Sequence, residues 1–156
     1  MDDNAINTKD SIANTKDSTV TLGKELMNLD DYNSSQLIEM ADANYKINNY
    51  AEAIRILDKV IMRDSTYGRA YYIRGNSFGG IQELEKSTQD YQTAIKLGYK
   101  EASCNYNIGL NFLPTSDSLA LYYFNKAILL DPSHRKAKRL KKMVERNSIQ
   151  KGRKRG

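Results

Sequence analysis

Side chains that could carry out catalysis are scarce in this chain of 156 residues. One cysteine, Cys104, and one histidine, His134, exclude a metal site with several thiolates and a zinc site with two or more histidines. A Ser/His/Asp arrangement is not available with one histidine at the edge of the last predicted linker. Gly75 and Gly79-Gly80 follow a predicted helix and lack the Gly-Lys-Ser/Thr ending of a phosphate-binding loop. We therefore predict a non-enzymatic protein without a metal or a cofactor.

We expect the single cysteine and the single histidine to have structural roles. Cysteine is commonly a buried small hydrophobe, and no base neighbours Cys104 in the sequence, so we expect Cys104 in the core. We expect His134 to cap or flank the last helix and to be exposed. The 11 tyrosines are better suited to binding, since each offers a large rigid ring with a polar tip. Among them, Tyr71, Tyr91 and Tyr123 fall at positions where we expect packing.

The elements that must position these side chains are helices. From Ser34 onward, apolar residues recur at i, i+3 and i+4, and Asn48-Asn49 marks a turn between two such segments. Two prolines and 9 glycines argue against an all-β chain, which would turn every 8–12 residues. No apolar run approaches the roughly 18 residues of a membrane helix. The pattern therefore predicts helical hairpins.

The hairpins repeat at a regular interval of about 34 residues. Four columns of residues keep this spacing: small residues at Ala41, Gly75 and Gly109, small residues at Ala53, Ser87 and Ala120, bulky residues at Leu57, Tyr91 and Phe124, and a last column at Val60, Ala94 and Ala127. In the last three columns the second step is shorter by one, which a single deletion in the turn at 114–117 explains. Small residues allow close helix approach, and stacked hairpins bury a continuous core.

These columns resemble the tetratricopeptide repeat family, whose pattern is W-x2-L-G-x2-Y, A-x3-F and a closing proline. The second repeat has Tyr71-x2-Arg74-Gly75-x2-Phe78, and the third has Ala120-x3-Phe124 and closes with Asp131-Pro132. The resemblance covers 34–134 and implies an all-α fold: a right-handed solenoid of three hairpins (34–67, 68–101 and 102–134) and a capping helix at about 132–147. Ser87, Ser65 and Tyr99 depart from the family pattern.

Further expectations concern the turns and the groove. We expect Gly79-Gly80 and Gly98 to supply left-handed turn residues, and Asp131-Pro132 to start the last helix. In the resembling family, the first helix of each repeat lines a concave groove. The positions this implies for partner binding are Ile38, Asp42, Tyr45, Tyr72, Asn76, Tyr106 and Leu110. The alternative is that the tyrosines among them only pack between helices.

One subtype of the family holds the C-terminal carboxylate of chaperones with lysine, asparagine and arginine. At the corresponding positions this chain has other residues: Ile38, Asp42, Ile73, Ser103 and Asn107. Because Asp42 would also repel a carboxylate, we expect no such clamp.

The two ends of the chain differ in charge. Residues 1–33 carry a net charge of −4 and are predicted to be a disordered polar arm, with a short amphipathic helix at Leu22, Leu26 and Leu29. That helix could fold back into the groove and block it. Residues 135–156 carry +10, although the whole chain carries only +5. We expect a solvated capping helix followed by a basic tail at 148–156.

Two functions are compatible with this organisation. The first is a scaffold that binds a peptide or helix of a partner protein in the groove. The second is an adaptor whose basic end at 135–156 binds nucleic acid or an anionic surface. Self-association through the apolar ends of the stack is a further prediction. The chain shows no signal peptide, which is compatible with the cytoplasm, but a secreted or lipid-anchored form without its leader would look the same.

Overall fold

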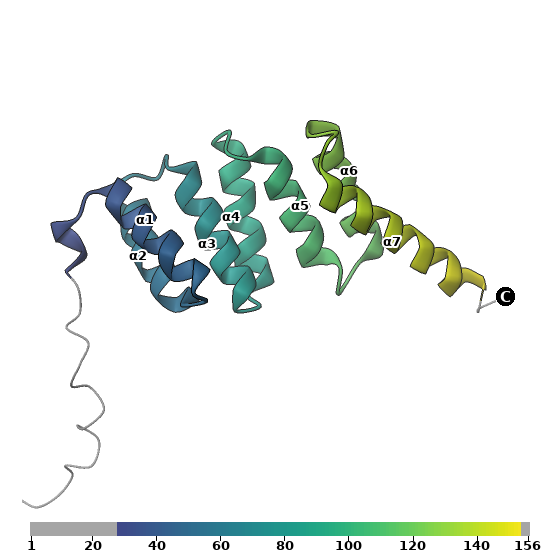
Figure 1. The fold of residues 1–156 in the computed structure, drawn as a ribbon, viewed down its shortest axis with the longest axis horizontal. Coiled ribbons are helices and arrows are strands. Elements are labelled where there is room, and N and C mark those ends of the chain that lie inside the picture. The colour runs from purple at the N-terminus through teal and green to yellow at the C-terminus, as the bar shows by residue number, and fades with distance from the viewer. Residues whose placement is uncertain (1–27, 154–156) are drawn as a thin grey trace, which may run out of the picture.

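A computed structural model describes residues 28–153, with side chains to Gln150. After a 3-10 helix, η1 (Leu29–Asp31), come α1 (Ser34–Lys46), α2 (Tyr50–Arg63), α3 (Gly68–Gly80), α4 (Leu84–Lys96), α5 (Glu101–Phe112), α6 (Asp117–Leu130) and α7 (Arg135–Arg153). The helices follow one another along the long axis of the molecule (Figure 1). The described residues contain no strand, which confirms the all-α prediction. None of the described helices is long and apolar enough to cross a membrane.

The repeat columns form the core between the helices of each hairpin. Ala41, Ala53, Leu57 and Val60 are fully buried in the first hairpin, and the corresponding residues are buried in the other two. A Cβ on Gly75 would lie 3.0 Å from the Tyr91 ring, and a Cβ on Gly109 would lie 2.6 Å from the Phe124 ring. The small residues therefore permit close helix approach, as the sequence indicated.

The turns agree only in part with the sequence predictions. Gly98 is left-handed, with φ of 70°. The prediction for Gly79-Gly80 is wrong, because both residues belong to α3 and the left-handed residue is Gln82, with φ of 63°. Gly80 is small for another reason: a Cβ there would lie 2.6 Å from the Tyr50 ring, in the helix of the preceding hairpin. Asn48, at the position of Gln82 one repeat earlier, is also left-handed.

Residues before the predicted boundary at residue 33 already belong to the folded domain. Leu29 is buried in the core of the first hairpin. The Arg63 guanidinium donates to the backbone carbonyls of Leu29 (3.0 Å) and Tyr32 (2.6 Å), and both Arg63 and Lys59 pair with Asp30. Residues 28–33 are thus part of the folded domain, which corrects the prediction for them. The rest of the predicted arm lies outside the described residues.

The last helix starts later and ends later than predicted. Asp131 and Pro132 lie in the turn before α7, where the Asp131 carboxylate accepts from the backbone N–H of Ser133 at 2.9 Å. His134 flanks α7 as expected, since its Nδ1 accepts from the backbone N–H of Ala137 at 3.2 Å, but it is half-buried rather than exposed. Because α7 continues to Arg153, residues 148–153 of the predicted basic tail are helical.

Candidate partner-binding face

The first helices α1, α3 and α5 carry the predicted groove residues, and the column closest to the core is largely covered. Ile38 is 3% exposed and belongs to the first core cluster, so it offers almost no surface to a partner. Tyr72 and Tyr106, at the same repeat position, are half-buried. The Tyr72 ring lies 6.0 Å from Tyr91 and 5.6 Å from Tyr99. The tyrosines of this column therefore pack against neighbouring rings and leave only part of their surface for contact with a partner.

A tyrosine–asparagine cluster, made of Tyr45, Tyr72, Asn76, Tyr91 and Asn107, joins three hairpins. The Tyr91 hydroxyl donates to Asn76 Oδ1 at 2.8 Å, and Asn107 Nδ2 donates to the same oxygen at 3.1 Å. Both bonds use the carbonyl of Asn76, and its N–H groups have no partner among the described residues. The cluster therefore offers amide donors in a fixed orientation beside half-buried aromatic rings.

The phenols of Tyr45 and Tyr91 are held in their neutral form. Burial raises the pKa of Tyr45 and of Tyr91 above the ordinary tyrosine value. The Lys100 ammonium lies 5.1 Å from the centre of the Tyr72 ring and supplies a positive charge at the edge of the cluster. Sequence reasoning named Tyr45, Tyr72 and Asn76 but missed Lys100. It considered Asn107 only as a mismatch to the carboxylate clamp.

The remaining predicted residues do not join this cluster. Asp42 is partly exposed and pairs with Lys46 at 2.7 Å. Tyr106 lies 4.8 Å from the His134 ring and 5.9 Å from the Phe124 ring, so it anchors the turn before α7. Leu110 packs against the third core cluster together with Leu140 of α7. In the third repeat, the predicted groove residues Tyr106 and Leu110 therefore pack against α7 and the turn before it.

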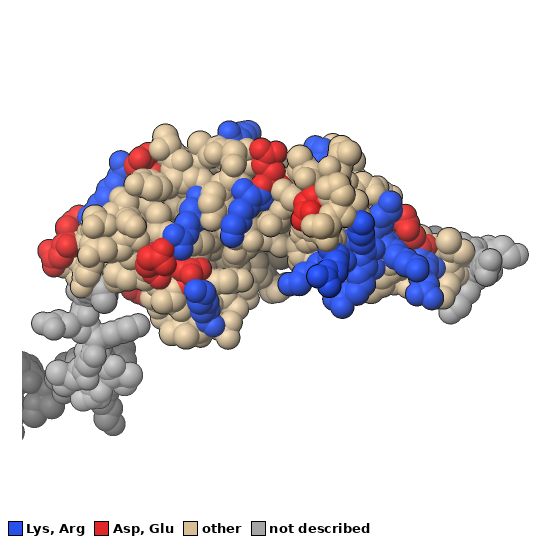
Figure 2. All heavy atoms as spheres, turned by 45° about the horizontal axis from the view of Figure 1, so that its top comes forward, with Lys and Arg blue, Asp and Glu red and all other residues tan. Residues whose placement is uncertain are grey.

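A cationic stripe runs along α7. It consists of the exposed residues Arg135, Arg139, Lys142 and Arg146, which share one face at i, i+4, i+7 and i+11. None of the four has an acidic partner among the described residues. Basic side chains gather over α7, whereas basic and acidic side chains are interspersed over the rest of the face shown (Figure 2). The stripe can attract a negatively charged partner.

The described residues contain neither an activated cysteine nor a group of side chains that could hold a metal ion. Cys104 is buried, as predicted, and its thiol donates to the Tyr99 carbonyl at 3.4 Å. Burial raises the pKa of the Cys104 thiol to about 12. In the described part of the chain, no three histidine, cysteine, aspartate or glutamate residues are grouped so that they could hold a metal ion.

Comparisons with known proteins give a weak likeness by sequence. No family model matches the chain. Subunit 3 of the anaphase-promoting complex of Schizosaccharomyces pombe is 22% identical over 114 residues, which are 72% of this chain. The match spans only 17% of the length of that curated relative.

Solved structures give a stronger likeness. The TPR domain of Arabidopsis OM64 superimposes with a TM-score of 0.69 at 20% identity, over 73% of this chain and 95% of that one. MamA superimposes with a TM-score of 0.70 at 25% identity, over 76% of this chain and 70% of that one. The first TPR of Spaghetti (RPAP3), bound to the HSP90 peptide SRMEEVD, has a TM-score of 0.69 at 15% identity, over 74% of this chain and 93% of that one. With the repeat register and three stacked hairpins, these likenesses show that the chain has the fold of tetratricopeptide repeat domains.

Proposed function

We propose that this chain is a non-enzymatic scaffold that binds a peptide or helix of a partner protein across the face formed by α1, α3 and α5. The observation that carries the proposal is the tyrosine–asparagine cluster. Its amide N–H groups can donate to a partner's backbone carbonyls, and its rings supply rigid contact area with little loss of conformational entropy. Asn76 and Tyr72 are the central contacts, with Tyr45 and Lys100 beside them.

Relatives of the same fold support a protein partner. One solved neighbour is described as bound to a peptide, and another, YrrB, as having an unusual peptide-binding site. The contacts in this chain differ from a carboxylate clamp. Ile38 and Ile73 are each 3% exposed, and Asn107 is engaged with Asn76. We therefore expect a C-terminal Glu-Glu-Val-Asp peptide to show no saturable binding in fluorescence anisotropy, and tight binding would contradict this assignment.

Asn76→Asp is the substitution that tests the proposal. It keeps an oxygen for both the Tyr91 hydroxyl and Asn107 Nδ2, but it removes the amide donors. The assay is affinity capture from the native lysate in the presence of nuclease, with wild-type protein and the variant at equal concentration. We expect the variant to fold normally and to lose the captured partner. Equal recovery of the same partner by both proteins would contradict the proposal.

A second candidate function rests on the cationic stripe. Four cations on one helix face, without an acidic partner in the described part of the chain, could contact phosphates of nucleic acid or of an anionic surface. No aromatic residue occurs in 135–156 to stack on bases, so such binding would depend on charge alone. Arg139→Glu together with Arg146→Glu should then abolish binding to a labelled duplex or to anionic vesicles, and the wild-type affinity should fall steeply with salt. Binding that is independent of salt would exclude this candidate.

A further inference from the structure

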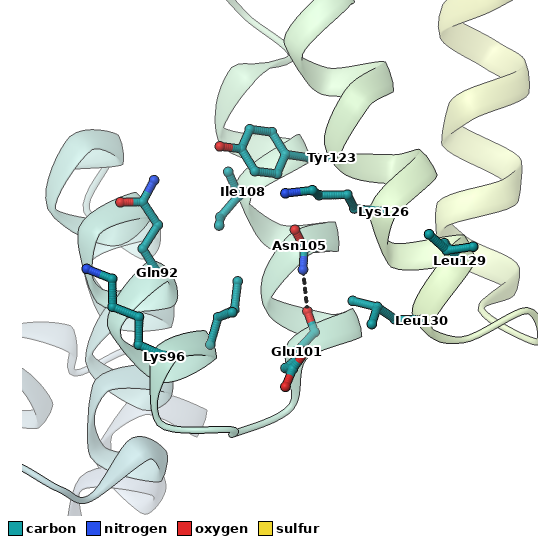
Figure 3. A pocket seen from close by; sticks show the side chains of 10 residues that line it. Gln92, Lys96, Glu101, Asn105, Ile108, Tyr123, Lys126, Leu129 and Leu130 are labelled. Atoms are coloured by element: carbon teal, nitrogen blue, oxygen red, sulfur yellow. Dashed lines mark hydrogen bonds between the residues drawn. The ribbon is translucent and has the colours of Figure 1, made fainter.

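A cavity of about 470 Å³ opens between the second helices α4 and α6, with α5 as its floor. Gln92 and Lys96 of α4 stand opposite Tyr123 and Lys126 of α6, and Asn105 and Ile108 of α5 lie between them (Figure 3). The remaining lining is mainly apolar: Ile95, Leu129 and Leu130. Leu129 is 82% exposed and leaves an apolar rim of the cavity open to solvent.

The same place one repeat earlier is bridged by ion pairs. Between α2 and α4, Arg74 of α3 donates to Asp90 at 2.8 and 2.7 Å and to Asp58 at 2.6 Å. Its guanidinium also lies 5.5 Å from the centre of the Tyr71 ring. This Asp58–Arg74–Asp90 clamp joins the two second helices across the floor helix.

The repeat register explains why the cavity exists. Asp58 and Arg74 correspond to Gln92 and Ile108 one repeat later. Asp90 corresponds to Tyr123 across the step that the deletion shortens, and Tyr71 corresponds to Asn105. The cavity therefore occurs where uncharged residues replace the three residues of the clamp and an asparagine replaces the tyrosine beside it. An asparagine and an isoleucine also fill less space than a tyrosine and an arginine.

The charges around the opening indicate what it would accept. Lys96 and Lys126 are exposed on opposite walls, and neither has an acidic partner among the described residues. Glu101 is the one acidic residue of the lining. We propose that this cavity is a second docking site, which takes an apolar side chain of a partner segment that carries carboxylates next to it. The apolar side chain would fill the space over Ile108, and the carboxylates would pair with Lys96 and Lys126.

This site is separate from the tyrosine–asparagine cluster, so the two proposals can fail independently. The probe is a library of random 12-residue peptides on phage, selected on the wild-type protein. Counter-selection uses a variant that carries Gln92→Asp, Ile108→Arg and Tyr123→Asp together, which places the residue types of the Asp58–Arg74–Asp90 clamp across the cavity and should close it. Affinities of the selected peptides are then measured by fluorescence anisotropy, with Asn76→Asp as the matched control and circular dichroism to check folding.

We expect selected peptides to share an apolar residue flanked by Asp or Glu, to bind at least tenfold more weakly to the closed variant, and to bind Asn76→Asp as well as wild type. Lys96→Glu with Lys126→Glu, both on the surface, should weaken the same peptides at least tenfold and remains decisive if the closed variant does not fold. Selection of basic peptides, equal affinity for the closed variant, or loss of binding in Asn76→Asp would overturn the proposal. A wild-type dimer in light scattering that the closed variant abolishes would also overturn it, in favour of a second copy of this chain.

Discussion

Three glycines, Gly75 and Gly79 on α3 and Gly109 on α5, allow the helix packing of this solenoid to be tested by glycine-to-alanine substitutions. Replacing a helical glycine with alanine gains up to about 1 kcal/mol from helix propensity. That gain should appear at Gly79, where the nearest atom to a new Cβ is Ser87 Oγ at 3.5 Å. At Gly109 a Cβ would lie 2.6 Å from the fully buried Phe124 ring and 3.3 Å from the Ala120 carbonyl. Overpacking of this kind costs about 1–3 kcal/mol.

The expected order of stability follows from these distances. Gly79→Ala should be about 0.5–1 kcal/mol more stable than wild type, because its contact is ordinary and it gains propensity. Gly75→Ala, with contacts of 3.0–3.2 Å to Tyr91 and the Ser87 carbonyl, should be nearly neutral. Gly109→Ala should lose about 0–2 kcal/mol, the overpacking cost of about 1–3 kcal/mol less a propensity gain of about 1 kcal/mol.

Urea denaturation followed by circular dichroism measures these differences. Phe124→Leu provides the internal control, since a smaller side chain there should relieve the contact. In a double-mutant cycle, Gly109→Ala should therefore cost less in the Phe124→Leu background than in the wild type. If Gly109→Ala is as stable as Gly79→Ala, or if the cycle shows no coupling, the assignment of Gly109 as a close-packing position is refuted.

Three further predictions concern single side chains. Asp90→Ala should destabilise the protein by about 3 kcal/mol in urea denaturation, because it leaves the partly buried Arg74 with only the exposed Asp58; a loss below about 1 kcal/mol would show that the clamp is not structural. The Ser133 hydroxyl and backbone N–H lower the pKa of Asp131, so its contribution is fully present above its ordinary value of 3.8 and is lost as the pH falls through the folded pKa. Asp131→Asn should therefore flatten the acid limb of a stability–pH curve, and an unchanged limb would argue against the bond. Burial raises the pKa of Cys104 to about 12, so native protein should react with iodoacetamide at pH 8 far more slowly than protein in urea, and equal rates by mass spectrometry would place the thiol at the surface.

The repeat columns could be predicted because their spacing is local and periodic. The small residue types of Ala41, Gly75 and Gly109 alone predict close helix packing, and the structure confirms this packing. The helix ends were less predictable. Gly79-Gly80 suggested a turn, but Gly80 is small because the Tyr50 ring of another hairpin lies against it, a contact that the sequence does not reveal.

The binding positions depended on neighbours that no local pattern shows. Ile38 and Tyr72 occupy the same repeat position, but only the tyrosine reaches beyond the core. The bonds from Asn107 and Tyr91 to Asn76 join three helices, so a pattern within one helix could not indicate them. Sequence reasoning missed the Asp58–Arg74–Asp90 clamp, although the repeat register could have found it. Three charged residues in one repeat correspond to three uncharged residues in the next.

Site-specific photo-crosslinking tests the central claim most directly, namely that a partner protein binds the first-helix face. The photoreactive residue p-benzoylphenylalanine would replace Asp42, which is partly exposed on α1, or, as the control, Met62, which is 72% exposed on α2. Our account predicts a protein adduct in the native lysate from the Asp42 position and none from the Met62 position. It also predicts that Asn76→Asp removes that adduct. An adduct from Met62 alone, or one from Asp42 that persists with Asn76→Asp, would contradict the account.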